Sequence, residues 1–196
     1  MKLIHITGKK GSGKTTLLKI IEDEGFPTEE VSVGYEFLAK YKPWLIETLP
    51  PPSEFKEHVI KIVYEYYWKE KYSDDCVLFF TGLYRPSEVE YLKKKGVLKF
   101  IVAVKVSKDY IRYERLLKRK RPGEENFTLE DFIIKDLHRD GLVEGYRNNN
   151  VSKIIEIADY VIYNDGTIED LKREAYRLLE ELERREIISR KDRKKV

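Results

Sequence analysis

Residues 8–15 read Gly8-Lys9-Lys10-Gly11-Ser12-Gly13-Lys14-Thr15. The stretch fits the pattern G-x-x-x-x-G-K-[ST] at every position, and this pattern is typical of a loop that wraps around phosphate groups. It follows an alternating, β-rich segment at residues 2–7 and precedes a segment typical of a helix. The sequence therefore predicts a phosphate-binding loop between a first strand and a first helix.

Each position of this loop has a physical task. Glycines permit backbone turns that a Cβ would block, so that successive N–H groups face one anion, and the following helix adds its unpaired N–H groups and its dipole. Lys14 is predicted to bridge the β- and γ-phosphates of ATP, and the Thr15 hydroxyl to ligate Mg²⁺. We interpret Lys9 and Lys10 as solvated charges that help to attract nucleotide. The predicted nucleotide-binding residues of this segment are Gly8, Gly11, Ser12, Gly13, Lys14, Thr15 and Thr16.

Strands and helices alternate along the rest of the chain. Apolar or alternating runs predict strands at residues 2–7, 30–33, 76–80, 98–106 and 160–163. Helix start signals follow these strands at Ser53, Pro86, Ser107, Thr128 and Thr167. This alternation implies βαβ units and a parallel sheet, with ligands bound beyond the carboxyl ends of the strands.

Composition narrows the class of protein. The chain has 196 residues and a net charge of +3, from 38 basic and 35 acidic residues. This balance calls for neither a nucleic-acid nor a membrane partner, and no apolar run approaches a membrane span or a signal sequence. Cys76 is the only cysteine, so no internal disulfide is possible and a reducing cytoplasm is expected. The sequence predicts no oligomeric state.

Three arginines share one face of a predicted helix. Arg112, Arg115 and Arg119 are spaced i, i+3, i+7, and Arg-Pro-Gly at residues 121–123 ends the helix. Arginine forks stabilise the charge of a phosphoryl group in transfer, although a solvated helix face is the alternative interpretation. We predict that Lys14, Arg115 and Arg119 are catalytic.

The remainder of the chain resembles the nucleoside monophosphate kinase superfamily of P-loop proteins, most closely its dephospho-CoA-kinase-like and archaeal adenylate-kinase-related branches. Residues 158–166 resemble a late A-D-Y-x-I-x-N-x-G strand, residues 82–90 resemble D-G-I-R-x-P-x-E-V, and residues 115–119 match R-L-x-x-R. The resemblance covers nearly the whole chain in the right order, and order carries more weight than any single later motif.

The resemblance implies a single three-layer P-loop domain over residues 1–196, with a central parallel five-stranded sheet flanked by helices. It also implies a helical acceptor-binding insert at 34–74, a LID at 119–150 and a basic tail at 189–196. The implied activity is transfer of the ATP γ-phosphoryl group to a nucleotide-like acceptor, a nucleoside monophosphate or dephospho-CoA. It also implies that Asn164 and Gly166 bind the adenine base through backbone contacts, where the alternative is a simple tight turn.

The chain departs from the family pattern on the acceptor side. Thr81 stands where an aspartate usually holds Mg²⁺ through water, and Tyr35 stands near where an acid usually faces the acceptor. Glu36 is predicted to substitute as a catalytic acid, with an ordinary exposed glutamate as the alternative. The expected insert also contains no arginine.

Two other functions compete with a kinase. One is a degenerate, weakly active nucleotide-binding regulator, because the acceptor-side acids are changed. The other is a nucleic-acid-linked kinase or ATPase, suggested by the arginine helix and by the charged residues 190–195. Near-neutral net charge argues against the second, and such a tail is usually a solvated, frayed end.

Overall fold

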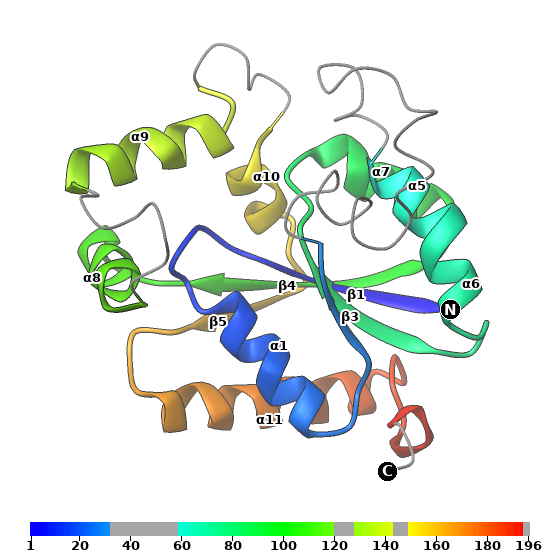
Figure 1. Ribbon diagram of the computed structural model, residues 1–196. Coiled ribbons are helices and arrows are strands. Elements are labelled where there is room, and N and C mark those ends of the chain that lie inside the picture. The colour runs from blue at the N-terminus through cyan, green and yellow to red at the C-terminus, as the bar shows by residue number, and fades with distance from the viewer. Residues whose placement is uncertain (32–58, 120–127, 143–148, 194–196) are drawn as a thin grey trace.

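The structure is a three-layer α/β fold in which helices cover both faces of one parallel sheet (Figure 1). The computed structural model describes residues 1–31, 59–119, 128–142 and 149–193. The expected insert at 34–74 and LID at 119–150 fall partly outside these ranges. Glu36 and Tyr35 lie outside them altogether, so the prediction that Glu36 is catalytic stays a prediction.

The sheet has five strands in the order β2-β3-β1-β4-β5, and every neighbouring pair is parallel. The strands are β1 (Lys2–Thr7), β2 (Thr28–Glu30), β3 (Val77–Thr81), β4 (Leu98–Lys105) and β5 (Tyr160–Tyr163). The predicted five-stranded parallel sheet is thus confirmed. Because β1 is the central strand, the glycine loop that follows it emerges at the middle of the carboxyl edge of the sheet.

Strand β2 ends at Glu30, whereas the sequence predicted a strand at residues 30–33. Glu30 pairs with Thr81, the last residue of β3, and the N–H of Val31 makes the last bond to this strand, at the Thr81 carbonyl oxygen. Val31 follows the strand and is nevertheless buried, so its apolar side chain is no sign that the strand continues. This correction places Glu30 at the carboxyl edge of the sheet, beside the glycine loop.

Helices on the two faces of the sheet bury two separate apolar clusters. One face is covered by α1 (Lys14–Asp23) and α11 (Ile168–Arg184). The other is covered by α5 (Val59–Val63), the π-helical turn η1 (Tyr64–Trp68), α7 (Pro86–Lys94) and α10 (Val151–Glu156). Helix α10 is not among the helices predicted from the sequence. The remaining elements are α6 (Lys69–Lys71), α8 (Asp109–Arg119), α9 (Leu129–Arg139) and the 3-10 turn η2 (Arg190–Asp192).

Of the five predicted helix starts, three are confirmed and one is wrong, while Ser53 lies outside the described residues. Pro86 occupies the first turn of α7, and Thr128 and Thr167 each form a reciprocal capping box with the residue three positions later. Ser107 does not cap α8, which begins at residue 109. Its N–H and hydroxyl instead donate to the carboxylate of Asp165, across the carboxyl ends of β4 and β5.

The start of the basic tail is folded rather than frayed. Arg193 lies 3.9 Å from Glu24 and 3.7 Å from Glu183, and residues 190–192 form η2. These contacts place charges of the tail against α1 and α11. No helix in the described part of the chain is long and apolar enough to cross a membrane.

Candidate nucleotide-binding site

The glycine loop connects β1 to α1 and curls over the first turn of that helix. Gly13 is the N-cap of α1, with a φ of 102°. The Lys14 ammonium donates to the carbonyl oxygens of Gly8 and Lys9, at 2.7 and 2.9 Å. A cation held on carbonyl oxygens is positioned to exchange them for the oxygens of a phosphate group.

Two loop glycines are required by their neighbours as well as by their conformation. A Cβ on Gly11 would lie 2.6 Å from the carbonyl oxygen of Arg112, and a Cβ on Gly13 would lie 2.2 Å from the Asn164 amide nitrogen. Both distances are too short for any real contact, and both glycines have positive φ. The loop is therefore packed from outside by α8 and by the segment after β5.

A cavity of about 630 Å³ opens in front of the loop, at the carboxyl edge of β1, β2 and β3. Of the residues predicted from the sequence, those that line it are Gly8, Gly11, Gly13, Lys14, Thr15, Thr16, Arg115 and Arg119. Ser12, Asn164 and Gly166 are not among its lining residues. The structure thus brings the loop and two of the three arginines together around one space.

Glu30 is a candidate site residue that the sequence reasoning missed. Its carboxylate accepts a hydrogen bond from the Thr15 hydroxyl at 3.0 Å, and it is the only carboxylate among the described residues that line the cavity. Thr81, where the resemblance expects an acid, also lines the cavity. The sequence prediction placed Glu30 at the start of a strand over residues 30–33. Had the strand been predicted to end at Glu30, this acid would have been expected at the carboxyl edge of the sheet, where it faces the glycine loop.

The neighbouring Glu29 points elsewhere, as expected for successive residues of a strand. It accepts a hydrogen bond from the Tyr72 hydroxyl at 2.6 Å and forms an ion pair with Lys71. Glu29 and Glu30 therefore have the same charge and different surroundings, which makes Glu29 a matched control for Glu30.

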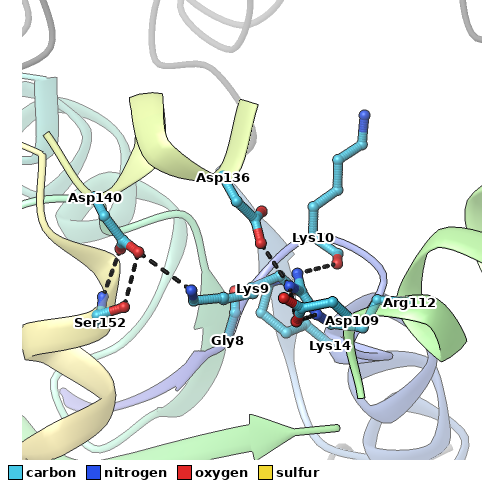
Figure 2. Close-up of polar contacts among 9 residues, drawn as sticks. All are labelled: Gly8, Lys9, Lys10, Lys14, Asp109, Arg112, Asp136, Asp140 and Ser152. Carbon is cyan, nitrogen blue, oxygen red and sulfur yellow. Dashed lines mark hydrogen bonds and ion pairs between the residues drawn. The ribbon is translucent and has the colours of Figure 1, made fainter. Parts of the chain in front are cut away.

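The arginine helix divides into one structural residue and two cavity residues. Arg112 is 2% exposed and lies 2.6 Å from the carboxylate of Asp136 on α9. It also donates to the carbonyl oxygen of Lys10 at 3.0 Å, as Figure 2 shows. Arg112 is therefore buried behind the loop, whereas Arg115 and Arg119, the two arginines predicted to be catalytic, line the cavity. Their catalytic role stays a prediction.

The segment after β5 supports the loop instead of lining the cavity. Asn164 is buried, and its side-chain amide donates to the carbonyl oxygen of Ser12 at 2.8 Å. Gly166 accepts a hydrogen bond from Arg115 at 3.3 Å. The contact that Asn164 makes with the loop comes from its side chain, so the expected backbone contact of this residue with adenine stays a prediction.

Lys9 is paired, contrary to the interpretation that it is a solvated charge. Its ammonium lies 3.3 Å from Asp140, which also accepts hydrogen bonds from the N–H and hydroxyl of Ser152 at the start of α10 (Figure 2). The loop is thereby linked to α9 and α10, which lie close to it in space and far along the chain.

A buried histidine lies below the loop. The Nδ1–H of His5 donates to the carbonyl oxygen of Phe80 at 3.3 Å, because a carbonyl can only accept. Complete burial lowers the pKa of His5 to about 3, with a smaller contribution from the charge of Lys14. His5 is therefore neutral at physiological pH. No group of three or more potential metal-ligating His, Cys, Asp or Glu residues occurs in the described ranges.

The fold and the loop define a P-loop protein with a kinase-like α/β architecture. A family described as AAA domain matches residues 4–132. A UPF0200 protein of Sulfurisphaera tokodaii is 31% identical over 188 residues, which cover 93% of this chain and 98% of that protein. The chain therefore belongs to this AAA-domain family of P-loop proteins, among the UPF0200 proteins.

Solved structures of small-molecule kinases have the same fold. A shikimate kinase from Bacteroides thetaiotaomicron aligns with a TM-score of 0.58 and 20% identity, covering 93% of this chain and 98% of that one. A gluconokinase from Sinorhizobium meliloti 1021 aligns with a TM-score of 0.55 and 17% identity, covering 94% and 97%. The expected kinase-like P-loop fold is confirmed, whereas the two branches suggested by the sequence stay a prediction.

Proposed function

We propose that this chain is an ATP-dependent kinase that transfers the γ-phosphoryl group of Mg-ATP to a small nucleotide-like acceptor, a nucleoside monophosphate or dephospho-CoA. One observation carries the proposal. Glu30, the only carboxylate among the described lining residues, accepts a hydrogen bond from the hydroxyl of Thr15. Lys14, Arg115 and Arg119 line the same cavity. An acid, a hydroxyl and cations in one cavity suit a metal-bound triphosphate.

The donor set fits Mg²⁺, which prefers oxygen ligands and retains several waters. The Thr15 hydroxyl and the Glu30 carboxylate, 3.0 Å apart, would hold it, Glu30 directly or through water. When bound, Mg²⁺ neutralises charge on the β- and γ-phosphates. Lys14 would leave the carbonyls of Gly8 and Lys9 for the phosphate oxygens, and the N–H groups of the loop would enclose the same oxygens.

The two cavity arginines would stabilise the transferred group. Arg115 Nη1 is buried and has no hydrogen-bond partner in the described part of the chain, so an anion at this position would satisfy it. In the transfer, the acceptor oxygen forms a bond to the γ-phosphorus while the bond to the ADP oxygen breaks. An acceptor phosphate needs no base. An acceptor hydroxyl would give its proton to Glu30 only where Glu30 holds Mg²⁺ through water, so that its carboxylate is free to accept the proton.

The test is phosphoryl transfer from Mg-ATP across a panel of acceptors. The panel contains nucleoside and deoxynucleoside monophosphates and dephospho-CoA, with shikimate and gluconate added because of the named structural relatives. We expect one acceptor to raise ADP formation, with Lys14→Ala and Glu30→Gln both defective and Glu29→Gln similar to wild type. If no acceptor raises turnover while Mg-ATP still binds, the kinase proposal is wrong.

Binding of Mg-ATP without turnover on any acceptor would support the alternative function, a nucleotide-binding regulator of weak activity. The observation that favours it is Thr81, which lines the cavity at the end of β3 in the place of the expected acid. The regulator predicts tight binding of Mg-ATP, little turnover, and a protein partner that is retained in pull-downs only with nucleotide. Loss of that retention in Lys14→Ala would separate it from adventitious binding.

A further inference from the structure

Two carbonyl groups of the glycine loop are held by side chains from outside the loop. Arg112 on α8 donates to the carbonyl oxygen of Lys10 at 3.0 Å. Asn164, after β5, donates to the carbonyl oxygen of Ser12 at 2.8 Å. The two carbonyls alternate along the chain, and neither Arg112 nor Asn164 is among the residues that line the cavity. Both donors therefore approach the loop from its outer side.

The orientation of a carbonyl fixes the orientation of the next N–H group. A trans peptide is planar, and its C=O and N–H point in opposite directions; the described chain has no cis peptide. Drawing the Lys10 and Ser12 carbonyls outward therefore turns the N–H groups of Gly11 and Gly13 inward. Gly11 and Gly13 both line the cavity, whereas Ser12 does not. Inward N–H groups at alternate positions form a concave anion site.

Arg112 is suited to this task and not to attracting phosphate. Besides Asp136, it forms an ion pair with Asp109 at 2.5 Å, so two carboxylates balance its charge. The ring of Phe132 lies 4.8 Å from the guanidinium, and the side chain is almost completely buried. A neutralised, immobile guanidinium contributes geometry rather than net charge. Figure 2 shows it fixed between α9 and the loop.

We propose that Arg112 and Asn164 are positioning residues that preset the phosphate-binding face of the loop by holding the carbonyls of Lys10 and Ser12 away from the cavity. The proposal rests on the proposed function only for the ligand, a triphosphate. Without these two donors, the peptides that follow Lys10 and Ser12 are free to rotate, and phosphate binding must then bear the cost of ordering them. Asp136 acts indirectly, because its ion pair holds Arg112 in position.

The experiment measures both the loop and its ligand. Backbone amide chemical shifts of Gly11 and Gly13 are recorded by NMR on the full chain without ligand. Dissociation constants for Mg-ATP and for inorganic pyrophosphate are then measured by calorimetry. The variants are Arg112→Met, which keeps much of the apolar volume, Arg112→Lys, and Asn164→Asp, which is isosteric but cannot donate. Arg177→Met is the control, because it removes an exposed guanidinium that pairs with Glu174 within α11.

We expect Arg112→Met and Asn164→Asp to shift the Gly11 and Gly13 amides and to weaken both ligands by the same factor, about tenfold or more (~1.4 kcal/mol for each tenfold). In a variant whose NMR spectrum shows fully folded protein, an equal factor for pyrophosphate, which has no base or sugar, assigns the loss to phosphate contacts. Arg112→Lys should recover part of the affinity, and Arg177→Met should match wild type.

Folded variants with wild-type amide shifts and dissociation constants within about twofold of wild type would overturn the proposal. If Arg112→Met does not yield folded protein, Asn164→Asp decides by the same criteria. Failure of the proposed function is a different result: no acceptor would then raise turnover, or wild-type protein would not bind Mg-ATP. In either case the ligand-free amide shifts would still report whether the two donors preset the loop.

Discussion

Replacing Gly13 by alanine measures how closely the segment after β5 packs against the loop. The added Cβ would lie 2.2 Å from the Asn164 amide nitrogen, and the backbone is held at a φ of 102°. The left-handed conformation costs an L-residue about 1–2 kcal/mol. Displacing the amide leaves the buried Ser12 carbonyl without its donor, at about 1–3 kcal/mol. Together these give a loss of roughly 2–5 kcal/mol, less the ~0.4–1 kcal/mol that alanine gains by restricting the unfolded chain.

Gly96→Ala is the matched control, because Gly96 has a φ of 69° and nothing within 4 Å of the added Cβ. It should lose only the conformational part, so urea unfolding should show Gly13→Ala less stable than Gly96→Ala by at least ~1 kcal/mol. The double variant of Gly13→Ala with Asn164→Ala should lose less than the sum of its parts, since the clashing amide is gone. Equal losses for the two glycine variants, or strictly additive losses in the double variant, would refute the reasoning.

Glu30→Gln should lower the rate of phosphoryl transfer by about 10²-fold or more and raise the Mg²⁺ concentration needed for half-maximal activity. In the same steady-state assays Glu29→Gln should match wild type. Equal rates for the two variants would show that Glu30 has no part in the mechanism. Burial holds the pKa of His5 at about 3, against 6.5 for an exposed histidine. Below pH 6.5 the unfolded chain therefore binds a proton that the folded protein does not, so the free energy of unfolding is greatest above pH 6.5 and declines as the pH falls toward 3, by at most about 5 kcal/mol. Urea titrations between pH 7 and pH 4 should show this decline in wild type and a shallower one in His5→Leu; parallel curves would contradict it. Asp136→Asn removes a partner of the buried Arg112 and should destabilise the fold by about 3 kcal/mol, measured by the same unfolding assay, with no loss contradicting a structural role.

The fold was predictable because its signals are local. The glycine loop, the apolar strands, and the helix starts at Thr128 and Thr167 each depend on a few neighbouring residues, and the structure confirms them. The predictions that failed depend on pairing between distant segments. The end of β2 is set by its register with β3, and Ser107 is engaged by Asp165, 58 residues away. Neither partner leaves a mark in the local sequence.

The candidate site was predictable only where it depends on local sequence, as the arginine helix shows. A helical spacing of i, i+3, i+7 correctly places three arginines on one stripe, yet the stripe extends about 10 Å along the helix at 1.5 Å per residue. Over that length the surroundings change. Arg112 meets the back of the loop and Asp136, whereas Arg115 and Arg119 reach the cavity. The contacts that decide the role of each arginine lie up to 102 residues away. Spacing therefore predicts which side chains share a face, and tertiary contacts decide whether a cation acts on phosphate or on the loop that binds it.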